Sequence, residues 1–203
     1  MKQLMGVILC GGESRRMGRD KGLLEKDGRR WAQYMADKLF FAGIPVVFSI
    51  NPPQLSTYTL HLPASRLIVD SPSLFSIAGP LRGLLSVHEQ FPGADLLLLA
   101  CDMIDMDEDT LRQLIDAYTN ATSPVAVTGS SAQPASPDFF VYQEGDFAQP
   151  FCGIYTSAGL AVVHTSALQE RLVDFSLQSL LRKGNTMRMP LQRIAAFRNY
   201  NTL

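Results

Sequence analysis

Cationic side chains crowd into one short stretch near the start of the chain. Residues 9–24 read LCGGESRRMGRDKGLL, in which two adjacent glycines precede the four cations Arg15, Arg16, Arg19 and Lys21. Glycines let the backbone turn sharply and approach a ligand closely, and successive N–H groups in such a turn form a concavity that binds anions. The stretch therefore predicts a phosphate-binding loop, with a solvated basic turn as the alternative.

The spacing in this stretch excludes two common phosphate-binding motifs. No Gly-Lys-Ser or Gly-Lys-Thr closes a P-loop, and Gly11, Gly12 and Gly18 lack the spacing of the dinucleotide fingerprint. The net charge of the whole chain is −1, so it has no general field for a nucleic-acid backbone. We expect no nucleic-acid partner, and any anionic ligand has to be met by the local patch.

Polar residues also follow three apolar runs. Asn51 follows PVVFSI, Asp70 ends RLIVD, and Asp102 ends ADLLLLACD. A carboxylate at the end of a buried strand is a suitable ligand for Mg²⁺, which keeps several waters and adds substrate phosphates. Asp102 is therefore a candidate metal ligand. The alternatives are that Asp102 caps a neighbouring amide and that Asp70, before Ser71 and Pro72, forms a turn.

Short apolar runs alternate with helical patterns along the first part of the chain. The pattern predicts strands at 4–9, 45–50, 66–70, 94–102 and 124–128, with helices at 31–43, 79–91 and 107–118. Such alternation indicates a mostly parallel sheet with helices on both faces. Because ligands bind at the carboxyl ends of the strands in open α/β sheets, we expect the glycine loop, Asn51, Asp70 and Asp102 to meet in one crevice.

The rhythm changes after residue 128. Residues 129–138 are small and polar and predict a loop, and residues 139–156 predict a hairpin that turns at Glu144-Gly145-Asp146. A helix over 165–182 and apolar pieces at 187–189 and 195–197 complete the chain. The 203 residues are most simply one α/β domain, Rossmann-like, with three α/β/α layers and a short antiparallel excursion in a mostly parallel sheet.

The stretch from Leu9 to Leu24 resembles the signature loop of the molybdenum cofactor guanylyltransferases, the molybdopterin-guanine dinucleotide biosynthesis protein A family. That pattern runs Leu-Ala-Gly-Gly, Arg-Met-Gly, Asp-Lys and Leu-Leu. The similarity continues in order through SIN, IVD, GPLRG, CDM, QPFCGIY and FRNYNT. It implies a single nucleotidyltransferase domain over residues 1–203 with the nucleotide-diphospho-sugar transferase fold. It also implies a Mg²⁺-dependent enzyme, with Mn²⁺ as a possible substitute, that transfers GMP from GTP to molybdopterin and releases pyrophosphate.

The resemblance implies a role for each matching residue. The catalytic residues would be Arg16, Lys21 and Asp102, with Asp102 also binding the metal. The GTP pocket would comprise Leu9, Cys10, Gly11, Gly12, Lys21, Asn51, Asp70, Gly79 and Asp102. The pterin side would comprise Pro80, Leu81, Gly83, Asn199 and Asn201. Relatives that use CTP tend to have Ala at the position of Gly11, so guanine is favoured over cytosine.

Three departures from the family pattern leave alternatives open. Cys10 replaces Ala, no Pro follows Asp102, and the chain ends at Leu203 where relatives usually add a short helix. The alternatives are a CTP-using or sugar-phosphate nucleotidyltransferase of the same fold, and a non-catalytic nucleotide- or pterin-binding subunit that delivers the cofactor.

The composition bears on location and partners. The three cysteines lack metal-ligand spacing, and no segment has the roughly 20 apolar residues of a membrane span. Free thiols suit a reducing compartment, so we expect a cytoplasmic protein with no membrane contact. Its partners would be GTP, molybdopterin and, transiently, the apo-enzymes that receive the cofactor.

Overall fold

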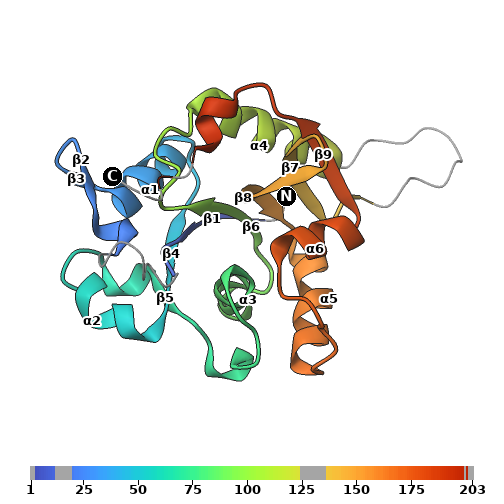
Figure 1. The fold of residues 1–203 in the computed structure, drawn as a ribbon, viewed down its shortest axis with the longest axis horizontal. Coiled ribbons are helices and arrows are strands. Elements are labelled where there is room, and N and C mark those ends of the chain that lie inside the picture. The colour runs from blue at the N-terminus through green and yellow to red at the C-terminus, as the bar shows by residue number, and fades with distance from the viewer. Residues whose placement is uncertain (1–2, 12–19, 124–135, 199, 201–203) are drawn as a thin grey trace, which may run out of the picture.

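A seven-stranded sheet forms the centre of the computed structural model, which describes residues 3–11, 20–123, 136–198 and 200 (Figure 1). The strands lie in the order β5-β4-β1-β6-β8-β7-β9. Their bounds are β1 Leu4–Leu9, β4 Val46–Ile50, β5 Leu67–Val69, β6 Asp95–Ala100, β7 Phe139–Glu144, β8 Phe147–Tyr155 and β9 Thr186–Pro190. Strands β5, β4, β1 and β6 are parallel neighbours, whereas β8 runs antiparallel to β6 and β7.

Helices cover both faces of this sheet, as the alternation predicted (Figure 1). One face packs against α1 (Trp31–Phe41) and α4 (Glu108–Thr122), and the other against α3 (Pro80–Gln90), α5 (Ser157–Leu168) and α6 (Leu177–Lys183). Every residue of β6 is buried, which explains its uninterrupted apolar sequence. The three-layer α/β/α fold is therefore confirmed. No helix within the described ranges has both the length and the apolar character needed to cross a membrane.

The predicted hairpin is confirmed, and a second one was not predicted. Strands β7 and β8 pair antiparallel around Gly145, whose φ is +55°. The short strands β2 (Glu25–Lys26) and β3 (Arg29–Arg30) form a separate two-stranded sheet. Asp27 and Gly28 connect them with φ values of +53° and +74°, as a type I′ hairpin turn requires.

The single helix predicted over 165–182 is wrong. The chain forms α5 up to Leu168 and α6 from Leu177, separated by a segment in which Glu170 has a φ of +54°. Ser176 begins α6 by accepting a hydrogen bond from the Ser179 N–H. The apolar piece at 187–189 belongs to β9, and that at 195–197 to a 3-10 turn, Ile194–Phe197. The predicted strand at 124–128 and most of the 129–138 loop lie outside the described residues.

Candidate active site

The carboxyl ends of four parallel strands carry the predicted site residues to one edge of the sheet. The N–H groups of Cys10 and Gly11 donate to the Ser49 carbonyl at 2.9 and 3.1 Å, which ties the end of β1 to β4. The Cys101 N–H donates to the Leu9 carbonyl at 3.2 Å, and the Asp70 N–H to the Ile50 carbonyl at 3.0 Å. The main chain thus holds all four strand ends in register.

Lys21 and Asp102 form an ion pair at this edge. The Lys21 Nζ lies 2.8 Å from the Asp102 Oδ2, and their side chains are only 19% and 13% exposed. Lys21 begins the 3-10 turn η1 (Lys21–Leu23), and the carboxylate of Asp20 caps that turn by accepting from the Gly22 N–H at 3.0 Å. The two predicted catalytic residues that lie in the described ranges are therefore in direct contact.

Two residues absent from the sequence prediction, Gln54 and Tyr58, hold the segment before Lys21. The Gln54 Nε2 donates to the Cys10 carbonyl at 3.0 Å and to the Asp20 carboxylate, and its Oε1 accepts from the Asn51 N–H at 2.8 Å. The Tyr58 hydroxyl donates to the Asp20 Oδ1 at 2.6 Å. Asn51 and Gln54 have the spacing of a capping box, so the sequence pattern could have predicted the contact between Gln54 and Asn51. No sequence pattern indicates the contact between Tyr58 and Asp20.

Asn51 contributes both main chain and side chain to this edge. A Cβ added to Gly11 would lie 3.8 Å from the Asn51 N, so the glycine backbone runs close beside Asn51. The Gln54 N–H donates to the Asn51 main-chain oxygen at 3.0 Å. Asn51 and Gln54 form a capping box, but the Gln54 N–H bonds the main-chain oxygen, and the buried Asn51 Oδ1 has no partner at hydrogen-bonding geometry in the described part of the chain. A buried acceptor of this kind is costly unless a ligand or water satisfies it.

Asp70 lies in the same region, against the first turns of α3. Burial raises the pKa of its carboxyl group, and Arg82, whose Nε is 4.0 Å from the Asp70 Oδ2, opposes that shift. A Cβ added to Gly83 would lie 3.6 Å from the Asp70 Oδ1, 3.0 Å from the Leu9 Cδ1 and 2.4 Å from the Ser49 Oγ. Gly83 therefore allows α3 to lie directly against the ends of β1, β4 and β5.

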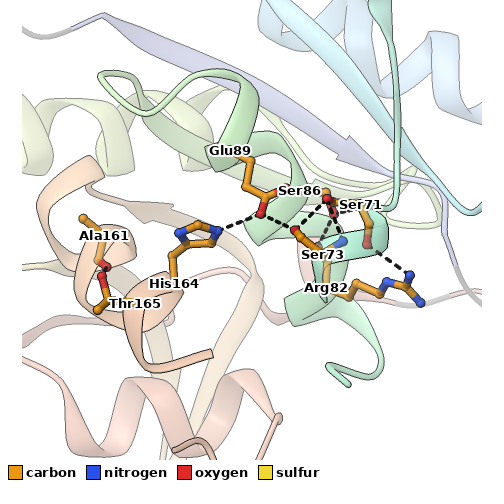
Figure 2. A network of polar contacts seen from close by, with 8 residues as sticks. All are labelled: Ser71, Ser73, Arg82, Ser86, Glu89, Ala161, His164 and Thr165. Carbon is orange, nitrogen blue, oxygen red and sulfur yellow. Dashed lines mark hydrogen bonds and ion pairs between the residues drawn. The ribbon is translucent and has the colours of Figure 1, made fainter. Parts of the chain in front are cut away.

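A polar network fixes the chain immediately after Asp70 (Figure 2). The Ser71 N–H donates to the Ser86 Oγ at 2.7 Å, and Arg82 donates to the Ser71 carbonyl at 3.1 Å. Farther along α3, Glu89 accepts from the Ser73 hydroxyl at 2.5 Å and contacts His164 of α5 at 2.9 Å. The network ties the segment after β5 to α3 and α5, so the main chain next to Asp70 is anchored to both helices.

Gly79, predicted for the GTP pocket, and the predicted pterin-side residues differ in what they present. Gly79 has φ +68° and ψ −156°, a conformation that only glycine adopts readily. Pro80 begins α3 and borders a cavity of about 650 Å³, whose lining also includes Phe147, Gln149, Pro150, Phe151 and Gln178. The Leu81 side chain is 1% exposed and packs in the core, so only its main chain is available to a ligand. Gly12, Arg16, Asn199 and Asn201 lie outside the described residues.

The arrangement of carboxylates limits how a metal could bind. Within the described ranges, no group of three or more His, Cys, Asp or Glu side chains is placed to hold a metal ion.

Another cavity, of about 440 Å³, surrounds Asp95 and Tyr118 near the start of β6, at the opposite edge of the sheet. It is therefore separate from the strand ends that carry Lys21 and Asp102.

Comparison with known proteins identifies the family. Residues 6–186 match the model of the MobA-like NTP transferase domain. The chain belongs to this family. A probable molybdenum cofactor guanylyltransferase of Pelotomaculum thermopropionicum is 27% identical over all of this chain and 89% of its own length. Membership places the chain among the NTP transferases.

Two other relatives match this MobA-like chain over shorter shares of their own length. This chain spans 40% of a bifunctional molybdenum cofactor biosynthesis protein of Synechocystis sp., at 30% identity over 77% of this chain. It spans 60% of a probable molybdenum cofactor guanylyltransferase of Methanothermobacter thermautotrophicus, at 37% identity over 58% of this chain.

Solved structures share the fold of this MobA-like chain. Molybdopterin-guanine dinucleotide biosynthesis protein A of Archaeoglobus fulgidus has a TM-score of 0.72 and 19% identity, covering 98% of this chain and 93% of its own. A Mycobacterium tuberculosis protein solved in complex with manganese has a TM-score of 0.60 and 17% identity, covering 93% and 88%. These neighbours confirm the predicted nucleotide-diphospho-sugar transferase type of fold.

Proposed function

We propose that this protein transfers GMP from GTP to molybdopterin, forming the guanine dinucleotide cofactor and releasing pyrophosphate. Residues 1–203 would act as one nucleotidyltransferase domain. Family membership and the guanylyltransferase relatives support the reaction. The observation that carries it is the Lys21–Asp102 contact at the strand ends, because it places a cation and a hard-oxygen ligand side by side.

The reaction is a displacement at phosphorus. An oxygen of the terminal phosphate of molybdopterin attacks the α-phosphorus of GTP. The bond between this phosphorus and the oxygen that bridges the α- and β-phosphates breaks. Pyrophosphate leaves with that electron pair. The attacking phosphate is already ionised, so the reaction needs no general base, and no histidine ends β1, β4, β5 or β6. The work of the protein is alignment and neutralisation of charge.

Lys21 and Arg16 would supply the positive charge. The Lys21 ammonium, now on Asp102, can also donate to phosphate oxygens because it carries three N–H donors. Arg16 is assigned to the triphosphate from the family pattern alone. Both side chains would offset the negative charge that develops on the phosphorus oxygens and the leaving group.

Asp102 fits the role of a Mg²⁺ ligand. Its carboxylate is largely buried, and no larger acidic cluster surrounds it in the described ranges. One protein carboxylate suits Mg²⁺, which takes its remaining oxygens from phosphates and water. When bound, Mg²⁺ would neutralise triphosphate oxygens. Mn²⁺ is the proposed substitute, since the mycobacterial neighbour was solved with that ion.

The remaining predicted residues divide between nucleotide and acceptor. The main chain of residues 9–12 (Leu9, Cys10, Gly11, Gly12), with Asn51, Asp70 and Gly79, would form the GTP pocket. The buried, unpartnered Asn51 Oδ1 supports this assignment because it could accept a hydrogen bond from the nucleoside. Pro80, Gly83, Asn199, Asn201 and the main chain of Leu81 would face the pterin. The three free cysteines favour the cytoplasm.

Pyrophosphate release tests the proposal directly. The purified protein would be incubated with molybdopterin, Mg²⁺ and either GTP or CTP, and the product would be identified by mass spectrometry. We expect the guanine dinucleotide, with release from GTP exceeding release from CTP. GTP binding without pyrophosphate release would instead support a delivery subunit, and faster turnover of CTP would reassign the base.

A further inference from the structure

We propose that Gln54 is a positioning residue of the nucleotide site and that it acts through Asp20, which it holds together with Tyr58. No contact of Gln54 or Tyr58 with a substrate is required. Their part is to fix where the chain leaves β1 and where it returns at Lys21. The kinetic consequence rests on the proposed GMP transfer, whereas the structural consequence does not.

The side chain of Gln54 connects three separate segments with one amide group. Its Nε2 donates to the carbonyl of Cys10, just after β1, and to the carboxylate of Asp20. Its Oε1 accepts from the N–H of Asn51, just after β4. The primary amide offers two donors and one acceptor in a plane, and each makes a contact here. Glutamate has the same size but no donor, so it cannot reproduce this arrangement.

These contacts hold the two ends of the glycine- and arginine-rich segment, residues 11–19. Cys10 precedes that segment and Asp20 follows it, and the same nitrogen of Gln54 contacts both. The two positions are therefore held together independently of what lies between them. Gln54 ends the 3-10 turn Pro52–Gln54, which directly follows β4, so the contacts of its side chain start from the end of a central strand.

Asp20 passes this constraint to Lys21. One oxygen of its carboxylate accepts from the Gly22 N–H at 3.0 Å and from the Tyr58 hydroxyl at 2.6 Å. Burial raises the pKa of Tyr58 well above its ordinary value, so the hydroxyl stays protonated and remains a donor. Lys21 lies between Asp20 and Gly22, and its Nζ reaches Asp102. A change in the position of Asp20 would therefore displace Lys21.

Close packing around Gly22 supports this interpretation. A Cβ added to Gly22 would lie 2.3 Å from the Tyr58 Oη and 3.4 Å from the Cys10 Sγ. The tyrosine hydroxyl thus fits directly against the backbone of η1, with the end of β1 beside it. Tyr58 is fully buried, so its ring is enclosed by the packing around it.

The chain offers a matched control for Tyr58→Phe. Tyr118 donates to the Asp95 Oδ2, also at 2.6 Å, but Asp95 begins β6 at the opposite edge of the sheet. Both Tyr→Phe variants lose a hydrogen bond from a buried tyrosine to a carboxylate, and each should be less stable. We expect Tyr58→Phe to lower kcat/KM for GTP about 10-fold, mainly in kcat, and Tyr118→Phe to stay within about twofold. Equal losses in the two variants would overturn the positioning role.

Substitution of Gln54 gives a second kinetic test. Gln54→Glu removes both donors and sets a carboxylate against Asp20, so we expect a loss of about 100-fold. Adding Asp20→Asn restores a donor opposite the new carboxylate and should recover part of that loss. Gln33, which donates to the His61 carbonyl at 3.2 Å, provides the control Gln33→Glu, expected to stay within about twofold. Failure of Asp20→Asn to improve Gln54→Glu would contradict action through Asp20.

Hydrogen exchange at the Gly22 amide separates this proposal from the proposed function. That amide donates to Asp20, so its exchange should be several-fold faster in Tyr58→Phe and Gln54→Glu and unchanged in Tyr118→Phe. If wild type transfers no GMP but exchange follows this pattern, GMP transfer fails and the positioning role stands. If transfer occurs but Gly22 exchange is unaffected by both substitutions, the positioning role fails and the proposed function survives.

Discussion

Replacing Lys21 by Met should move metal affinity and turnover in opposite directions. The Lys21 Nζ lies 2.8 Å from the Asp102 Oδ2, so a divalent cation competes with the ammonium group for this carboxylate. Met keeps much of the length and the apolar stem but removes the ammonium group. Divalent cations should therefore bind the free variant more tightly, although the variant has lost a cation that the reaction needs.

The distance sets the scale of this effect. Two unit charges 2.8 Å apart attract by about 6 kcal/mol at an effective dielectric of 20. Dehydration of the pair and freedom of the lysine to move aside offset most of that attraction. A residual of about 1.4 kcal/mol corresponds to a tenfold change in affinity. We expect about tenfold tighter Mn²⁺ binding to the free variant, and kcat/KM lower by about 10²–10³ from the loss of a charge stabiliser.

Electron paramagnetic resonance of free Mn²⁺ measures the first quantity and pyrophosphate release the second. Lys26→Met is the control, because Lys26 pairs with Asp105 at 3.7 Å in a more exposed setting. It should leave both quantities within about twofold. Unchanged or weaker Mn²⁺ binding in Lys21→Met would refute the competition, and turnover within twofold of wild type would remove Lys21 from catalysis.

Three further predictions follow from the same region. Asp102→Asn should abolish Mg²⁺-dependent turnover with an unchanged circular dichroism spectrum, and an unaltered Mg²⁺ titration curve would exclude it as the ligand. Gly83→Ala should lower the urea midpoint, because a Cβ 2.4 Å from the Ser49 Oγ overpacks the site at a cost of about 1–3 kcal/mol. We expect this cost to exceed the gain of roughly 1 kcal/mol in helix propensity. A stabilised variant would contradict this. Burial raises the folded-state pKa of Asp70, so the ionised group destabilises the fold. Asp70→Asn should therefore be more stable than wild type at pH 7. The difference in unfolding free energy, measured by urea titrations at several pH values, should vanish as the pH falls below the ordinary Asp pKa of about 4. A difference that does not change with pH would refute this cause.

The strand ends could be predicted because their signals are local. The apolar run of β6 is buried on both sheet faces, and the polar residue that stops it is visible in the sequence as Asp102. The same holds for Asn51 after β4 and Asp70 after β5. Since parallel strands end at one edge, the approximate meeting of these residues follows from topology alone.

Other features depended on contacts that no local pattern encodes. The residues from 165 to 182 have enough helical character to suggest one helix, but Glu170 with positive φ and the capping Ser176 divide them. Leu81 belongs to a motif that marks the site, yet its side chain completes the core beneath α3. Tyr58 reaches Asp20 across 38 positions of sequence, and only the packing of the folded chain brings the two together.

The predicted residues Lys21 and Asp102 carry the charges of the site, whereas the unpredicted residues Gln54 and Tyr58 determine where Lys21 lies. Register between β1 and β6 pairs Leu9 with Ala100 and so places Asp102 through the sheet. The sheet does not place Lys21 in the same way, because the chain leaves β1 at Leu9 and Lys21 lies well beyond that end. Its position is set by Asp20, Gln54 and Tyr58. Variants of Gln54 and Tyr58 should therefore weaken the alignment of the cation and leave the carboxylate in place, whereas Asp102→Asn removes the carboxylate and with it the ion pair of Lys21.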